Sequence, residues 1–266
     1  MKVVFEEILE RKPLKTADGI PFFGGEEDGD WFSEEDLLSM RNGGLEQNWI
    51  TPLPWADGGL EPLLREIARR GRPVVDLASG PGLGLLPSLY RLAPALPTLA
   101  VDANAGVLGE WGRFFREKGI SDPPDLLEAS LYDLPFRAGS AEVFTSMIGI
   151  SSTRDGEEGY RKALRGIARA LSSGGVLYAV ENEWTDVPGI LSLFHKAGET
   201  PWDVFLERQL SWRERFAECG LTVESEALLE RRRLKGNGED NELGDLSERY
   251  GVPVYLDWKL FTVRKG

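Results

Sequence analysis

The sequence predicts an α/β fold built on one mostly parallel sheet, with an antiparallel pair of strands toward its C-terminal end. Between residues 61 and 180, short apolar segments of strand length alternate with segments of helical period. This order gives parallel strands joined by right-handed crossovers. The first strand leads directly into a glycine-rich turn at 80–84. Two later apolar strands, 221–234 and 254–263, follow one another in the chain and predict an antiparallel hairpin at a sheet edge.

The first 60 residues predict an N-terminal cap or extension that lies outside the sheet. Ser33 and Asp36 stand before an apolar pair, in the pattern of a capping box at a helix start, and an acidic run begins at Glu26. The segment is also rich in aromatic side chains, namely Phe5, Phe22, Phe23, Trp31, Phe32, Trp49 and Trp55. So much aromatic surface suits a cap laid over the core. The alternative is an extension that packs on the sheet.

Residues 61–266 predict the main domain. In its first helix, 61–70, Leu63, Leu64 and Ile67 fall on one face. The elements expected after it are strand 74–78, helix 84–92, strand 98–102, helix 106–118, strands 126–130 and 143–148, helix 160–171, a turn at 172–175, strand 176–180, helix 203–218 and a long acidic loop at 235–251.

The glycine-rich turn predicts a nucleotide-like ligand. Gly80 and Gly82 let the backbone approach a ligand that a Cβ would block, and the helix that follows offers free N–H groups. The spacing departs from the dinucleotide fingerprint, because Leu85 stands where a third glycine is expected and the glycine falls at Gly84 instead. The alternative is a glycine-rich turn without a ligand.

A carboxylate on the next strand supports this interpretation. Asp102 ends the apolar strand 98–102 and lies 102 − 80 = 22 positions after Gly80. An acid at that spacing can accept hydrogen bonds from both hydroxyls of a ribose. Nicotinamide cofactors and methyl-donor cofactors share this feature, so it does not separate them. A solvated aspartate at a strand end is the alternative.

Three segments together resemble class I S-adenosylmethionine-dependent methyltransferases of the small-molecule type. They are the Asp76-x-Ala78-x-Gly80-x-Gly82-x-Gly84 motif, the segment 128–136 with its Leu-Pro-Phe, and the order of helix, Gly174-Gly175 and strand. The resemblance extends over about 62–234 and is most specific over 74–180. It implies a Rossmann-like sheet with S-adenosylmethionine as the cofactor. The antiparallel strands near the end also fit this family, whereas a dinucleotide-binding sheet ends in a parallel strand.

The resemblance also implies roles for individual residues. Asp76 would pair with the amino group of the methionine end, and Asp102 would bind the ribose. The remaining residues expected to contact the cofactor are Ala78, Ser79, Gly80, Gly82, Ala103, Ser130, Leu131, Asp133 and Ser146. Ser130 occupies the position where the family usually has the acid that binds adenine. Either Asp133 or the Leu131 backbone could serve adenine in its place.

Methyl transfer needs few catalytic groups from the protein, because the methyl group on the sulfonium is already activated and the reaction depends on positioning. A base is needed only if the acceptor must lose a proton. His195 and Glu181 are candidates, and their alternatives are a surface or packing histidine and a solvated glutamate. The resemblance places a substrate insert at about 182–202, where Trp184 and Trp202 could line an acceptor pocket with Trp31, Trp49 and Trp55, or pack in the core. The 149–152 segment has small hydroxyls where relatives often carry aromatic or histidine residues.

Composition narrows the class of protein further. The net charge of −13 disfavours a nucleic-acid substrate, and Arg231–Arg233 is a solvated strand segment on this interpretation. Cys219 is the only cysteine, so a disulfide within the chain and a cysteine-rich metal cluster are excluded, and no metal is expected. No apolar run approaches the roughly 20 residues that span a bilayer, and no signal peptide is recognisable. We therefore expect a cytoplasmic protein that binds neither membrane nor nucleic acid.

The sequence thus predicts a methyltransferase that uses S-adenosylmethionine and acts on a small molecule. One alternative is a protein that binds S-adenosylmethionine without catalysis, favoured by the lack of aromatic or histidine residues in the 149–152 segment. A nicotinamide-dependent oxidoreductase is the other, disfavoured by Leu85 and by the terminal antiparallel strands. The acceptor and the oligomeric state are left open.

Overall fold

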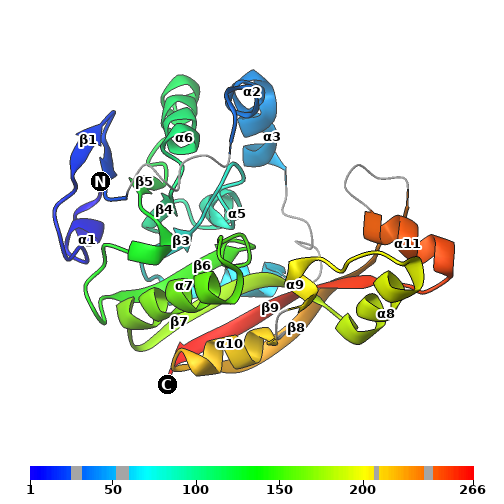
Figure 1. Ribbon diagram of the computed structural model, residues 1–266. Helices are drawn as coiled ribbons and strands as arrows, with labels where there is room; N and C mark the ends of the chain where they lie inside the picture. The colour runs from blue at the N-terminus through cyan, green and yellow to red at the C-terminus, as the bar shows by residue number, and fades with distance from the viewer. Residues whose placement is uncertain (25–31, 52–59, 207–209, 237–241) are drawn as a thin grey trace.

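The fold is known from a computed structural model, which describes residues 1–24, 32–51, 60–206, 210–236 and 242–266. In these residues one nine-stranded sheet runs in the order β1-β2-β5-β4-β3-β6-β7-β9-β8 (Figure 1). Its strands are β1 (Lys15–Ala17), β2 (Ile20–Phe22), β3 (Val74–Leu77), β4 (Thr98–Asp102), β5 (Asp125–Glu128), β6 (Ala141–Met147), β7 (Leu171–Trp184), β8 (Leu221–Arg233) and β9 (Tyr255–Lys265). All neighbouring strands from β2 to β7 are parallel, and β9 pairs antiparallel with β7 and β8. The predicted fold class is confirmed.

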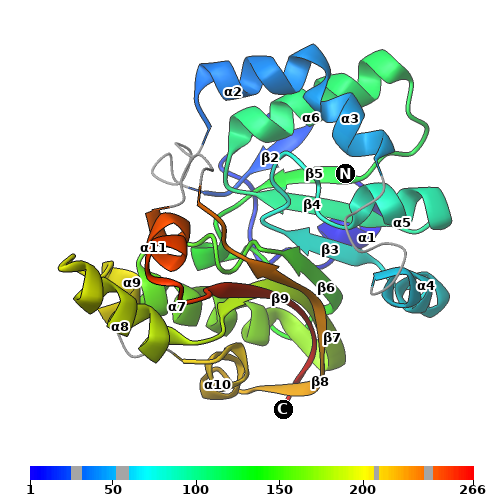
Figure 2. The same cartoon turned by 90° about the vertical axis from the view of Figure 1, so that its right-hand side faces the viewer.

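Helices cover both faces of the central strands because these strands are apolar on both sides. Val74 faces one cluster of buried side chains and Val75 the other, as alternate residues of a strand must. The first cluster belongs to α3 (Leu45–Ile50), α4 (Glu61–Arg70), α5 (Leu86–Leu92) and α6 (Ala105–Lys118), and the second to α1 (Val3–Glu6), α7 (Gly156–Ala170) and α10 (Trp212–Glu218). Figure 2 shows α2 (Glu34–Ser39) and α3 lying alongside α6.

The N-terminal segment departs from the prediction, because part of it belongs to the sheet. β1 and β2 form a hairpin whose second strand pairs with β5. The turn is Asp18-Gly19, and both residues have positive φ (51° and 80°). This dipeptide is a strong hairpin signal that the sequence carried. The expected helix start at Ser33 is confirmed, since Ser33 and Asp36 form a capping box. Most of the acidic run, with Trp31, and Trp55 lie outside the described residues.

The second half of the chain contains three differences from the expected elements. β7 begins at Leu171, so the expected turn at 172–175 is instead an irregular start of the strand. The helix expected at 203–218 is two helices, α9 (Asp203–Leu206) and α10, and α10 has its own start at a Ser211–Glu214 capping box. The loop expected at 235–251 contains α11 (Glu242–Tyr250). Strong tertiary packing explains α11, whose Leu243 and Leu246 are buried against α8 (Val187–Ala197).

In the part of the chain that the structure describes, no helix combines the length and the apolar character needed to cross a membrane. The same residues contain no cluster of three or more histidine, cysteine, aspartate or glutamate side chains suited to hold a metal ion.

Candidate functional site

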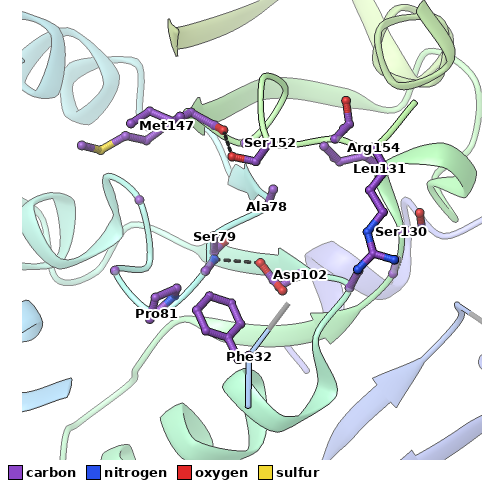
Figure 3. A pocket seen from close by; sticks show the side chains of 18 of the residues that line it. Phe32, Ala78, Ser79, Pro81, Asp102, Ser130, Leu131, Met147, Ser152 and Arg154 are labelled. Atoms are coloured by element: carbon purple, nitrogen blue, oxygen red, sulfur yellow. Dashed lines mark hydrogen bonds between the residues drawn. The ribbon is translucent and has the colours of Figure 1, made fainter. Parts of the chain in front are cut away.

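A pocket of about 580 Å³ opens at the carboxyl ends of the parallel strands. It lies where the chain order reverses, between β3 and β6, which is the usual ligand position in an open α/β sheet. Its volume is in the range of small-molecule sites. Figure 3 shows lining side chains from β4, from the turns after β3, β5 and β6, and from Phe32 of the N-terminal segment.

The turn after β3, residues 78–84, forms one wall of the pocket, and we call it the glycine loop. Gly80 and Gly82 both line the pocket, and a Cβ built on either would meet no atom within 4 Å. These two positions therefore keep space open for a ligand. Gly84 is different, because a Cβ there would lie 2.3 Å from Oδ2 of Asp76; its φ of +50° is close to that of Gly80, which is +55°. Ala78 and Ser79 also line the pocket, as expected.

Asp76 lies below the glycine loop and does not line the pocket. Its side chain is fully buried, and Thr145 Oγ1 donates a hydrogen bond of 2.5 Å to its Oδ1. Burial raises the pKa of Asp76 to about 7, against the opposing effect of this hydrogen bond. Because this carboxyl group is buried and does not line the pocket, its pairing with an amino group stays a prediction.

Asp102 does line the pocket, at the end of β4. The Gly80 N–H donates to its Oδ2 and the Asn104 N–H donates to its Oδ1, each at 2.8 Å. Burial raises the pKa of Asp102, and these two hydrogen bonds oppose the shift. A carboxylate offers about four lone-pair positions, so both oxygens retain acceptor capacity toward a pair of ribose hydroxyls. Its neighbour Ala103 lines the same wall.

The structure separates the candidates for the adenine end. Ser130 and Leu131 line the pocket, and Ser130 Oγ accepts from the Tyr132 N–H at 3.1 Å. Asp133 does not line it. Its side chain is 63% exposed and pairs with Arg11 at 2.5 Å. Of the alternatives left open by the sequence, the segment 130–131 is therefore the one that reaches the pocket.

Three further candidates lie away from the pocket surface. Ser146 is fully buried within β6. His195 is exposed on α8. Glu181 is fully buried at the end of the parallel part of β7. The structure thus brings neither candidate base to the pocket surface.

Of the five tryptophans that could line the acceptor pocket, the three that the structure describes do not line it. Trp49 packs against Tyr90, Trp111 and the two phenylalanines of α6. The insert at 182–202 forms a separate cluster with α11, in which Trp184 and Trp202 both contact Phe205. These tryptophans are packing residues.

Among the lining residues that sequence reasoning missed are two larger groups. One is Phe32, Asn48 and Thr51 of the N-terminal segment, and the other is the stretch from Met147 to Arg154 without its two central residues, Ile150 and Ser151. Asn48 is tied to the glycine loop, since its Nδ2 donates to the Pro81 carbonyl at 2.9 Å. Figure 3 shows the Arg154 side chain reaching toward Leu131 and Ser130. No local motif marks these residues, because the tertiary fold alone brings them to the pocket.

Comparisons with known proteins agree with this geometry. Residues 75–179 match the family model described as "Methyltransferase domain". A ubiquinone/menaquinone biosynthesis C-methyltransferase UbiE of Rhizobium meliloti is 30% identical over 163 residues, which cover 61% of this chain and 58% of the relative. The corresponding protein of Sinorhizobium fredii is 28% identical over 165 residues, covering 60% of this chain and 58% of the relative. The chain thus spans little more than half of these relatives' length.

Two solved structures share the fold. One is a "putative methyltransferase" of Bacillus halodurans, with a TM-score of 0.51 and 16% identity over 76% of this chain and 96% of that one. The other is a chain from the complex between the Haloferax volcanii Trm112 methyltransferase activator and a "putative methyltransferase". It has a TM-score of 0.50 and 22% identity, and the match covers 86% of this chain and 94% of that one.

The fold is that of Rossmann-like methyltransferases. More particularly, residues 75–179, from β3 into β7, match a methyltransferase domain, and this part of the chain is similar to class I S-adenosylmethionine-dependent methyltransferases.

Proposed function

We propose that this protein transfers a methyl group from S-adenosylmethionine to a small-molecule acceptor. One observation carries the proposal: the glycine loop, the Asp102 carboxylate and the 130–131 segment converge on a single pocket at the switch point of the sheet. The matched family and the names of the relatives support the same chemistry. Neither a nicotinamide-dependent oxidoreductase nor a binding protein without catalysis finds support among them.

The residues around the pocket suit the parts of S-adenosylmethionine. Gly80 and Gly82 would admit the methionine end against the backbone, and Asp102 would accept from the ribose hydroxyls. Ser130 and Leu131 would contact adenine. The bound cofactor would supply an activated methyl group on its sulfonium centre. Asp76 would act from below, because it holds the glycine loop that the cofactor touches.

For the acceptor, we infer a molecule with a largely apolar body. Phe32, Met147 and Ile148 give the pocket an apolar wall, and the relatives bear names of C-methyltransferases in quinone biosynthesis. Among the described lining residues, only Asp102 and Arg154 carry a formal charge at neutral pH. The protein would therefore act mainly by holding donor and acceptor in line and by excluding water. We propose that the later part of the N-terminal segment, which contains α2 and α3, serves as a cap over this pocket, since Phe32, Asn48 and Thr51 reach it. A cytoplasmic location stays a prediction.

Calorimetric titration with S-adenosylmethionine, S-adenosylhomocysteine and NAD tests the proposal. We expect micromolar binding of the two sulfur ligands and none of NAD. Asp102→Ala should weaken the sulfur ligands at least ~100-fold, since each hydrogen bond to a charged group contributes roughly 1.5–3 kcal/mol. Asp133→Ala is the matched control, an acid close in the chain that lies off the pocket, and it should bind like wild type. Preference for NAD, or no binding by a folded protein, would refute the proposal.

Once binding is established, a panel of apolar small molecules with activated ring carbons tests the acceptor class. Methyl transfer to such carbons, followed by mass, is the expected result. Methylation of charged, non-aromatic acceptors alone would contradict the inferred apolar acceptor and leave the cofactor assignment intact.

A further inference from the structure

The segment from Ile148 to Arg154, which we call the β6–α7 loop, forms a second wall of the pocket. Five of its seven residues line the pocket, and the two that do not are Ile150 and Ser151. Its first residue is a β-branched side chain at φ +61°, a conformation that costs on the order of 1–3 kcal/mol and persists only where the surroundings impose it. Something must therefore hold this loop in place.

The two residues that turn away from the pocket are bound from below by Glu181. The Ile150 N–H donates to Oε1 of Glu181 at 3.1 Å, and the Ser151 N–H donates to Oε2 at 3.1 Å. The Glu181 side chain has no exposed surface. Both of its oxygens are thus used to hold the backbone of the loop at the two positions between the lining residues.

The charged neighbours of Glu181 pair with other residues and do not compete with the loop for its carboxylate. Arg215 of α10 is the cation that acts on Glu181 electrostatically, but its guanidinium is already paired with Glu157 of α7 at 2.5 Å. Lys259, the register partner of Glu181 on β9, binds Glu183 and Glu226 instead. The hydrogen-bond donors to Glu181 are therefore groups of the loop itself, namely the N–H groups of Ile150 and Ser151 together with the Ser151 side chain.

We propose that Glu181 is a positioning residue that, as a carboxylate, holds the β6–α7 loop in the shape that binds the cofactor, and that proton uptake by Glu181 loosens the loop and weakens binding. This inference rests on the proposed function, because it assigns a control to the same pocket. The chemical reason is the number of acceptors. A protonated carboxyl group keeps one acceptor oxygen free of hydrogen, and its hydroxyl faces an N–H donor, so one of the two loop contacts is lost.

The range in which this control operates follows from burial. Burial of Glu181 raises its pKa to about 7, and the hydrogen bonds from Ser151 and Ile150 only partly offset the shift. A change from pH 8 to pH 6 would thus convert most of the molecules from the carboxylate to the protonated form. The loop would respond within the physiological range.

The test measures the affinity for S-adenosylhomocysteine from pH 5.5 to 8.5 in wild type and in Glu181→Gln. Glutamine has the shape of the glutamate and, like the protonated acid, offers only one acceptor. We expect wild type to bind about 10-fold more weakly at pH 6 than at pH 8, which corresponds to roughly 1.4 kcal/mol. Glu181→Gln should bind at pH 8 as wild type does at pH 6, with a flatter profile.

Two other groups titrate near this pocket and need their own control. The pKa of Asp76 is also raised to about 7, and burial raises that of Asp102. In Asp76→Asn, whatever its overall affinity, the pH dependence contributed by Glu181 should remain. Asp102 is present in both variants, so its contribution cancels when their profiles are compared. A profile that Asp76→Asn flattens and Glu181→Gln leaves unchanged would overturn the proposal.

Amide hydrogen exchange without ligand separates this inference from the proposed function. After correction for the intrinsic exchange rate, the amides of Ile150 and Ser151 should lose protection in Glu181→Gln and, in wild type, as the pH falls from 8 to 6. The amides of β3 serve as the internal reference. If Glu181→Gln does not fold, the wild-type measurement decides alone, and unchanged protection refutes the inference. Failure of wild type to bind S-adenosylhomocysteine at any pH would instead refute the proposed function.

Discussion

Two neighbouring loops line the pocket, and each lies over a buried carboxyl group, but the two carboxyl groups contact their loops in different ways. The glycine loop covers the buried carboxyl group of Asp76, and the β6–α7 loop covers that of Glu181. Burial raises both pKa values to about 7. Both loops contain residues other than glycine at positive φ, such as Ala78 and Ile148. They meet at Gly149, where a Cβ would lie 2.6 Å from the Cβ of Ala78.

The two carboxyl groups differ in how strongly they restrict the residue types of the loop above them. The Asp76 carboxyl group lies so close to the backbone that only a glycine fits at position 84. That demand restricts the residue type and leaves a motif in the sequence. Glu181 takes hydrogen bonds from two main-chain N–H groups, which every residue except proline can supply. These contacts leave no motif in the sequence, so the attachment of the second loop to Glu181 could be found only in the structure.

The largest expected effect comes from a substitution that removes the glycine beside the Asp76 carboxyl group. In Gly84→Ala, the new Cβ would overlap the Asp76 carboxyl group, and alanine would have to adopt a φ of +50°. We expect a loss of roughly 2–4 kcal/mol in the free energy of unfolding, from overpacking and backbone strain together. Denaturant unfolding followed by circular dichroism measures it.

Gly82→Ala is the matched control for that variant, because a Cβ at this position meets only the open pocket. Its stability should stay within about 0.5 kcal/mol of wild type, while its affinity for S-adenosylhomocysteine should fall at least about 10-fold. Equal destabilisation of the two variants would show that the close approach of Gly84 to Asp76 is not what sets the glycine at that position.

The same distinction explains which parts of the fold the sequence could predict. Elements whose ends are marked by residue type were predicted closely: α4 with its terminal Gly71, β4 ending at Asp102, and α6 ending at Gly119. The N-terminal hairpin was missed although Asp18-Gly19 marks its turn, because the segment was treated as one irregular cap. The α11 helix was missed because the acidic, glycine-rich sequence that precedes it is typical of a loop. Its stability comes from packing on α8, which the local sequence does not encode.

The residues of the site also differ in whether their type and spacing made them predictable from the sequence. The positions of Asp102 and the glycines at the pocket were predictable, since their types and spacing follow from the ligand they are expected to contact, and that of Ser130 followed from the resemblance alone. Phe32 and Asn48 reach the pocket only through the packing of α2 and α3 on α6, and no spacing along the chain encodes that contact. For Asp76, the role at the methionine end stays a prediction, because sequence does not reveal on which side of the loop a carboxyl group lies, and the structure places this one off the pocket surface.

A second prediction sharpens the comparison through pH. Folding raises the pKa of each of these carboxyl groups from about 4 to about 7. Between these two pH values, the folded protein therefore binds more protons than the unfolded protein. The free energy of unfolding contributed by Asp76 and Glu181 therefore falls as the pH rises through this range. Asp76→Asn should remove its share, flattening the slope by up to ~1.4 kcal/mol per pH unit.

Urea unfolding of wild type and Asp76→Asn at pH 5, 6, 7 and 8 provides the measurement. Subtracting the free energies of unfolding of the two proteins removes the contribution of the other acids, of which a chain with 44 aspartates and glutamates has many. A difference that does not change with pH would mean that Asp76 titrates alike in the folded and unfolded states, and the likeness between the two buried acids would then fail.

The smallest expected effect concerns the contact that joins the N-terminal segment to one loop and not to the other. Asn48 donates from Nδ2 to the Pro81 carbonyl of the glycine loop, at an exposed position. Asn48→Ala should cost no more than about 1 kcal/mol of stability, as an exposed hydrogen bond does, and should weaken S-adenosylhomocysteine binding a few-fold. Gln47→Ala is the control, since among the described residues the Gln47 side chain donates within its own segment, to Thr51. Hydrogen exchange should rise in the glycine loop of Asn48→Ala and stay unchanged at Ile150 and Ser151, because Glu181 holds the latter independently of α3. A rise in both loops would mean that the two walls of the pocket move as one unit and that the N-terminal segment controls both.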